Sequence, residues 1–167
     1  MGIVENIEKS GVEMFKQAPH LPKNVRDWIT NNAWWIVLIG VILSILSVLS
    51  LVPILAGASV INSMYAAYAP YAAASNGNFI IAAWVSLIFL AVVVYLEAMA
   101  IKPLQAKTKR GWDLVFLAFL VSIASSLVNF VITMQVSSLL GIVLAVVIGG
   151  YFLFEARGGF VQKSDKK

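Results

Sequence analysis

The sequence predicts an all-α fold: a bundle of four transmembrane helices, with an N-terminal amphipathic helix and a short outer interfacial helix. Three observations predict this class. Hydrophobic residues make up 60% of the 167-residue chain and charged residues only 12%, whereas soluble domains carry about 25% charged residues. The mean hydropathy is +0.89. Finally, four apolar stretches approach or exceed the roughly 20 residues that cross a hydrocarbon core.

Composition also limits the domain organisation. No hydrophilic segment reaches the roughly 40 residues that a segment needs to fold alone. The chain has no cysteine, which excludes disulfides and thiolate metal sites. We therefore expect a cytoplasmic or interfacial segment over residues 1–32, a transmembrane domain over 33–157 and a basic cytoplasmic tail over 158–167. Within the transmembrane domain, the spans are expected at 33–56, 78–101, 112–134 and 137–154.

The N-terminal segment has a helical pattern of apolar residues. Ile3, Ile7, Met14 and Phe15 fall near one helical face, with charged residues elsewhere. This pattern predicts a helix in the headgroup region or packed under the bundle; a docking helix for a cytoplasmic partner is the alternative. His20 is the single histidine and has no ligand-type neighbour in sequence, which favours a solvated or interfacial side chain.

The segment between the first two spans is uncharged and rich in alanine and tyrosine. Over residues 57–77, apolar and tyrosine side chains recur at helical spacing. We expect a short helix lying on the outer surface, with Asn76 and Gly77 forming the turn into the second span. A re-entrant loop is the functional alternative.

The second span carries one carboxylate, Glu97. A carboxylate within a membrane helix is costly, and such residues are functional candidates by default. Because Glu97 lies about one turn before Lys102, a structural ion pair is favoured over a proton or ion site.

The third span holds the most polar stripe of the chain. Its members recur at i, i+3, i+4, i+7 and i+11, and are Ser122, Ser125, Ser126, Asn129 and Thr133. An amide within hydrocarbon needs a hydrogen-bonding partner, so Asn129 is expected to fasten two helices. Lining a polar path is the alternative, and Glu97 is a further candidate for that path.

The fourth span contains a row of small residues at four-residue spacing, namely Gly141, Ala145 and Gly149. Such a row lets helix backbones approach closely, within the bundle or between subunits. The span ends in an aromatic belt, and Gly158 and Gly159 are expected to stop the helix.

The charges predict the orientation. All 12 lysines and arginines fall on one side of an even-numbered bundle, which places both termini in the cytoplasm of a plasma membrane, here the bacterial inner membrane. Acidic and basic residues meet at the same inner rim, where ion pairs are expected. The residues concerned are Lys102, Arg110, Asp113, Glu155 and Arg157.

Three short motifs resemble those of uncharacterised small bacterial four-helix integral membrane proteins. They are Ile-Lys-Pro-Leu at 101–104 with its basic loop, Gly-Trp at 111–112, and Tyr-Phe-Leu-Phe-Glu-Ala-Arg at 151–157. The resemblance covers mainly residues 95–157. It implies a four-helix membrane fold and no activity.

The residue types favour a non-enzymatic scaffold or assembly subunit. The buried polar residues are mostly Ser, Thr and Asn, which suit packing, and no catalytic constellation, metal-ligand set or cofactor motif is present. The expected partners are the lipid bilayer, anionic lipid headgroups, and either a second copy or other membrane proteins; the charge distribution argues against nucleic acid. A small oligomeric channel or transporter is the alternative, and a lipid-acting enzyme is a distant third.

Overall fold

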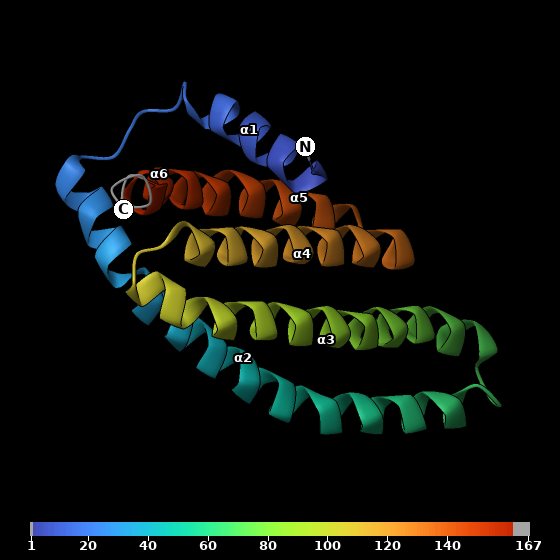
Figure 1. The fold of residues 1–167 in the computed structure, drawn as a ribbon. Coiled ribbons are helices and arrows are strands. Elements are labelled where there is room, and N and C mark those ends of the chain that lie inside the picture. Colours follow the sequence, from blue (N-terminus) through green and yellow to red (C-terminus); the bar gives the residue numbers. More distant parts are fainter. Residues whose placement is uncertain (1, 162–167) are drawn as a thin grey trace.

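A computed structural model describes residues 2–161, and this part of the chain contains helices and no strand. Figure 1 shows their arrangement. In chain order the helices are α1 (Ile3–Phe15), α2 (Lys23–Tyr65), α3 (Pro70–Gln105), α4 (Lys109–Thr133), α5 (Val136–Leu144) and α6 (Gly150–Val161). A π-helical turn, η1 (Ala145–Gly149), joins α5 to α6.

Four helical stretches are long and apolar enough to cross a membrane. They are Lys23–Tyr65, Pro70–Gln105, Lys109–Thr133 and Leu139–Phe160. The predicted all-α class with four apolar helices of spanning length is therefore confirmed. Two of the helices are much longer than the predicted spans.

The separate outer helix predicted over residues 57–77 is wrong. Helix α2 continues to Tyr65, and α3 begins at Pro70, so only residues 66–69 connect them. Alanine favours helix continuation, and proline is well tolerated in the first turn of the next helix. Asn76 and Gly77, the predicted turn, lie inside α3. At its other end, α2 begins at Lys23, so the boundary expected at residue 33 falls within a continuous helix.

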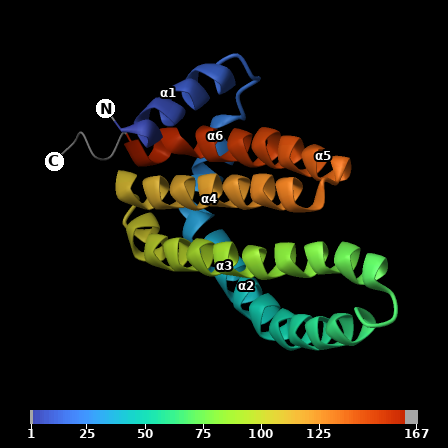
Figure 2. The ribbon, with the colours of Figure 1, turned by 90° about the vertical axis from the view of Figure 1, so that its right-hand side faces the viewer.

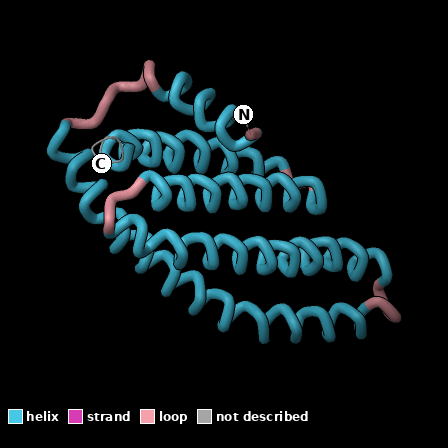
Figure 3. The backbone as a smooth tube through the Cα atoms, in the orientation of Figure 1, coloured by secondary structure: helices cyan, strands magenta, loops and turns pink. Residues whose placement is uncertain are grey.

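Helices adjacent in sequence pack as antiparallel neighbours, in the order α2, α3, α4 and α5–α6 (Figures 1 and 2). The α2–α3 hairpin extends past the end of α4, while α1 lies obliquely across α6 on the opposite side of the bundle. Loops are confined to short connections, as the tube drawing shows (Figure 3). The start of α2, the α3–α4 connection and the end of α6 meet at one end, called here the rim.

The buried core lies at the rim. It is formed by residues from α3, α4 and α6, namely Ala100, Leu104, Trp112, Phe116, Ala156 and Phe160. In contrast, no residue from Ile42 through Ala72 is buried. Partly buried residues of α2, among them Ile29 and Trp34, pack against this core, so packing joins the helices at the rim and leaves the opposite end of α2 without a buried residue.

The α3–α4 corner depends on glycine. A Cβ atom at Gly111 would lie 2.7 Å from the backbone nitrogen of Leu104, so α4 approaches the end of α3 more closely than any side chain permits. Lys107 makes the turn with a φ of 52°, and its ammonium donates to the Asn31 side chain on α2. The Thr108 hydroxyl donates to the carbonyl of Pro103 at 3.0 Å and closes the corner.

The predicted helix stop at Gly158 and Gly159 is wrong, because α6 continues to Val161. A Cβ atom at Gly159 would lie 2.5 Å from the Thr30 side chain, so this glycine serves the contact between α6 and α2. Of the predicted basic tail, residues 162–167 lie outside the described part of the chain.

Candidate functional site

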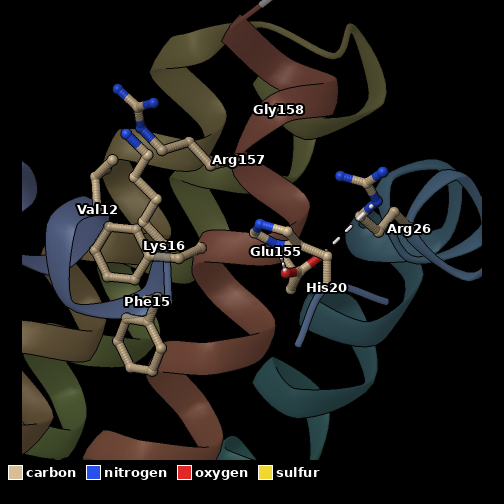
Figure 4. A pocket seen from close by; sticks show the side chains of 9 residues that line it. Val12, Phe15, Lys16, His20, Arg26, Glu155, Arg157 and Gly158 are labelled. Atoms are coloured by element: carbon tan, nitrogen blue, oxygen red, sulfur yellow. Dashed lines mark hydrogen bonds and ion pairs between the residues drawn. The ribbon is translucent and has the colours of Figure 1, made fainter. Parts of the chain in front are cut away.

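Polar side chains gather in two places. The first is a pocket of about 190 Å³ at the rim, between α1, the α1–α2 connection, α2 and α6 (Figure 4). We call it the rim pocket. Its lining residues are Val12, Phe15, Lys16, His20, Arg26, Phe154, Glu155, Arg157 and Gly158.

Glu155 is the buried carboxylate of the rim pocket. Its side chain is 5% exposed, and His20 Nδ1 donates to its Oε1 at 2.7 Å. Arg26 Nε lies 3.8 Å from its Oε2, which is too far for a hydrogen bond. Tyr151, one turn earlier on α6, donates its hydroxyl to the carbonyl of Pro19. These contacts fasten the α1–α2 connection to α6.

A second ion pair attaches α1 itself. Arg157 donates from Nε and Nη2 to Oε1 of Glu8, at 2.9 and 2.7 Å. The Arg157 guanidinium also lies over the Trp112 ring, 5.6 Å from its centroid. Lys109, at the start of α4, places its ammonium 3.7 Å from Glu8 Oε2. A buried carboxylate of α1 is thus neutralised by cations from α4 and α6.

The rim therefore holds ion pairs, but their partners differ from the prediction. Asp113 pairs with Lys109, its i−4 neighbour, at 3.2 Å, whereas Arg110 forms no ion pair within residues 2–161. Lys102 likewise forms no ion pair within residues 2–161. It follows Glu97 by five residues, a spacing that places the two side chains on different faces of the helix. The predicted pair between them is not formed.

Glu8, Arg26 and the partner of His20 were not predicted from the sequence. A weak signal was present, because Glu8, Gly11 and Phe15 share a helical face at i, i+3 and i+7. This face contacts α6: Phe15 stacks on Phe154 with ring centroids 5.4 Å apart, and a Cβ at Gly11 would lie 2.3 Å from the Phe154 ring. Met14, assigned to the apolar face, is 59% exposed.

The second place is a cavity of about 600 Å³ between α2, α3 and α4, called here the interhelical cavity. Four residues of the predicted polar stripe line it, namely Ser122, Ser125, Asn129 and Thr133. Asn129 Nδ2 donates to Ser86 Oγ on α3 at 2.6 Å. Ser86 is thus the interhelical partner of Asn129, and it was not predicted from the sequence.

The hydroxyls of Ser122, Ser126 and Thr133 bond within their own helix. Ser122 donates to the carbonyl of Ala118 at 3.0 Å, and Thr133 to that of Asn129 at 2.8 Å. Among the stripe residues, Asn129 is the one whose side chain bonds to another helix in the described part of the chain. Glu97 does not line the cavity, and no hydrogen bond or ion pair joins it to another residue of the described chain. The structure therefore brings four of the five candidate path residues together and leaves Glu97 apart.

Within the bundle, the row of small residues does not form one contact surface. A Cβ at Gly149 would lie 2.9 Å from the Phe119 ring, but Gly141 has nothing within 4 Å and Ala145 is exposed. The π-helical turn over Ala145–Gly149 explains the difference. Its wider turn rotates the residues that follow relative to those before it, so the four-residue spacing no longer marks one face.

Within residues 2–161, no three His, Asp or Glu side chains come together as a metal site. Comparisons with protein-family models, curated proteins and solved structures found no match to this chain. The resemblance of residues 95–157 to small bacterial membrane proteins stays a prediction.

Proposed function

We propose that this chain is a multi-pass protein of the bacterial inner membrane with both termini in the cytoplasm. We further propose that it acts without catalysis, as a scaffold or assembly subunit that packs with other membrane proteins or with a second copy.

The charge distribution supports the orientation. No charged residue occurs between Asp27 and Glu97, so the whole α2–α3 hairpin tip is uncharged. In the described part of the chain, basic residues instead lie at or near the rim, at the start of α2, on the α3–α4 connection and near the end of α6. Positively charged connections remain on the cytoplasmic side of a membrane.

Cysteine labelling tests the orientation. Because the chain has no cysteine of its own, any label on it marks the introduced residue. Two single variants are compared, Thr108→Cys at the rim and Ala67→Cys at the hairpin tip, both at exposed positions. In intact cells, a membrane-impermeant maleimide is expected to label only Ala67→Cys, and to label Thr108→Cys after lysis. Labelling of Thr108→Cys before lysis would contradict the proposed orientation, because it would place the rim outside the cytoplasm.

The exposed outer part of the α2–α3 hairpin is the observation that carries the scaffold proposal. Helix α2 has 43 residues and α3 has 36, although about 20 suffice to cross the bilayer. At the tip, Tyr68 and Tyr71 are 89% and 94% exposed. Tyrosine is enriched at protein interfaces and at membrane surfaces, since its ring is apolar and its hydroxyl polar. The hairpin tip thus offers a large, uncharged surface for a partner helix.

A small oligomeric channel or transporter is the second candidate, and the interhelical cavity favours it. The cavity is roomy, and Asn129 presents an amide beside Ser86. Four helices enclose little space on their own, so a path along the third span would need several subunits.

Asn129→Leu separates the two functions. Loss of the bond to Ser86 is expected to lower stability by about 0.6–1.7 kcal/mol and to reduce partner recovery after purification in mild detergent. Proteoliposomes of both proteins are expected to stay impermeable to small solutes. Asn32→Leu is the matched control, since Asn32 donates only to the carbonyl of Trp28 on its own helix. Wild-type solute flux that Asn129→Leu abolishes, with assembly intact, would favour the channel.

A further inference from the structure

The interhelical cavity has one polar wall, mostly from α4, and is otherwise apolar. Along α3 it runs from Phe79 to Val93, a length of about 20 Å at the rise of an α-helix. Leucine, phenylalanine, valine and alanine side chains form the rest of the lining, and no charged residue belongs to it. Its volume of about 600 Å³ lies in the range of pockets that bind small molecules. The cavity therefore suits an uncharged molecule with a long hydrocarbon part.

The cavity is accessible from the side of the bundle. Leu51 on α2 and Phe79 on α3 belong to its walls, and their side chains are 41% and 43% exposed. Both helices are long and apolar enough to span a membrane, so the proposed insertion places these exposed wall residues against lipid. A ligand that is dissolved in the bilayer can enter directly from the hydrocarbon.

Near its middle, the polar wall has unused hydrogen-bonding capacity. Three of its four hydroxyls, those of Ser86, Ser122 and Thr133, donate to carbonyls of their own helices. Asn129 Nδ2 donates to Ser86 Oγ and, at 3.1 Å, to the carbonyl of Ser125. In contrast, Asn129 Oδ1 and the Ser125 hydroxyl form no hydrogen bond within residues 2–161. An acceptor and a hydroxyl, one helical turn apart, are thus left for a ligand.

A ligand hydroxyl matches this pair. It can donate to Asn129 Oδ1 and accept from Ser125 Oγ, whereas an ether oxygen can only accept. The hydrocarbon around the bundle offers neither group a partner, so a hydroxyl that bonds to both is stabilised in the cavity. A charged headgroup would lose its hydration there without meeting a counter-ion in the lining. This complementarity selects a neutral lipid with a free hydroxyl.

We propose that the interhelical cavity binds a neutral lipid alcohol with one hydrocarbon chain, its hydroxyl between Asn129 and Ser125 and its chain along the apolar walls of α2 and α3. A chain that spans one leaflet is roughly 15 Å long, half of the hydrocarbon core, and this length fits the cavity. The inference rests on the membrane insertion proposed above. It rests neither on the scaffold role nor on the channel.

Photolabelling tests the site. The full chain is reconstituted in vesicles of dioleoyl phosphatidylcholine with an oleyl alcohol analogue that carries a diazirine in its chain, and mass spectrometry locates the labelled residues. Labelling of the cavity walls is expected to saturate and to be displaced by oleyl alcohol. Oleyl methyl ether has the same chain but no donor. It should compete about fivefold less well, a factor that corresponds to about 1 kcal/mol for one hydrogen bond.

Two outcomes of this experiment would overturn the proposal. Wall labelling that rises in proportion to the analogue without saturating would reduce the contact to that of surrounding lipid. Equal competition by the alcohol and the ether would remove the recognition of the hydroxyl. Asn129→Leu should abolish the preference for the alcohol, because it removes the acceptor.

Ala83→Leu tests the cavity while leaving Asn129 and its bond to Ser86 in place, in case Asn129→Leu impairs folding. Ala83 lines the cavity, so a larger side chain there takes up part of its volume. Saturable labelling is expected to fall about fivefold or more, as for an overpacked site. Ala98→Leu is the matched control, since Ala98 is exposed on the same helix and lies outside the lining.

Labelling of Ala98→Leu is expected to stay within about twofold of the wild type. Unchanged labelling of Ala83→Leu, or an equal loss in both variants, would overturn the site. Protein that alkaline carbonate extracts from the vesicles without detergent would contradict the proposed function. Inserted protein whose wall labelling does not saturate contradicts only this inference.

Discussion

Gly111→Val should prevent the α3–α4 corner from closing. The new Cβ would meet backbone atoms of Leu104 and Pro103 at 2.7 and 2.8 Å, and no change of side-chain rotamer can relieve a backbone clash. We expect the free energy of unfolding to fall by about 3 kcal/mol or more, at the upper end of what overpacking costs. Unfolding in mixed detergent and dodecyl sulfate, followed by circular dichroism, measures the change.

Gly40→Val is the control for this variant. It introduces the same side chain within a helix, but a Cβ at Gly40 meets nothing within 4 Å. We expect a change of about 0.5 kcal/mol or less, as for other substitutions away from packed sites. Equal destabilisation by the two variants would mean that the helical preference of valine, rather than the close α3–α4 approach, governs the effect.

Trp112→Ala should remove the centre of the rim core. The side chain is 1% exposed, stacks on Phe116 with centroids 5.0 Å apart, and donates from its indole nitrogen to the carbonyl of Leu153 at 2.9 Å. Replacing a buried tryptophan with alanine costs about 3–5 kcal/mol. Arg157 also loses the ring beneath its guanidinium, so the attachment of α1 through Glu8 should loosen.

Trp28→Ala is the matched control, because Trp28 is 60% exposed near the same rim. Its loss of stability should stay below about 1 kcal/mol, because substitutions of exposed side chains away from packed sites cost little. Limited proteolysis of the α1–α2 connection gives a second measurement, with faster cleavage expected only in Trp112→Ala. A Trp112→Ala protein as stable as the Trp28→Ala protein would show that the rim cluster does not hold the helices together.

The predictions from sequence that proved wrong have different causes. The outer helix over 57–77 was wrong because its alanines favour helix continuation, and α2 extends to Tyr65. Gly159 does not end α6, since it packs against Thr30 on α2. The row at Gly141, Ala145 and Gly149 does not form one surface within the bundle, because a π-helical turn changes the phase of the helix.

The sequence by itself determined the all-α class, the four apolar helices and the polar stripe of α4 that lines the interhelical cavity. These properties depend on the hydropathy and spacing of residues close together in the chain, so they can be predicted from the sequence alone. Only the tertiary structure decided that Glu8 meets Arg157, 149 positions along the chain, and that His20 meets Glu155. Such contacts depend on how helices cross and which faces they turn to each other, and the side chains that set this geometry are far apart in sequence.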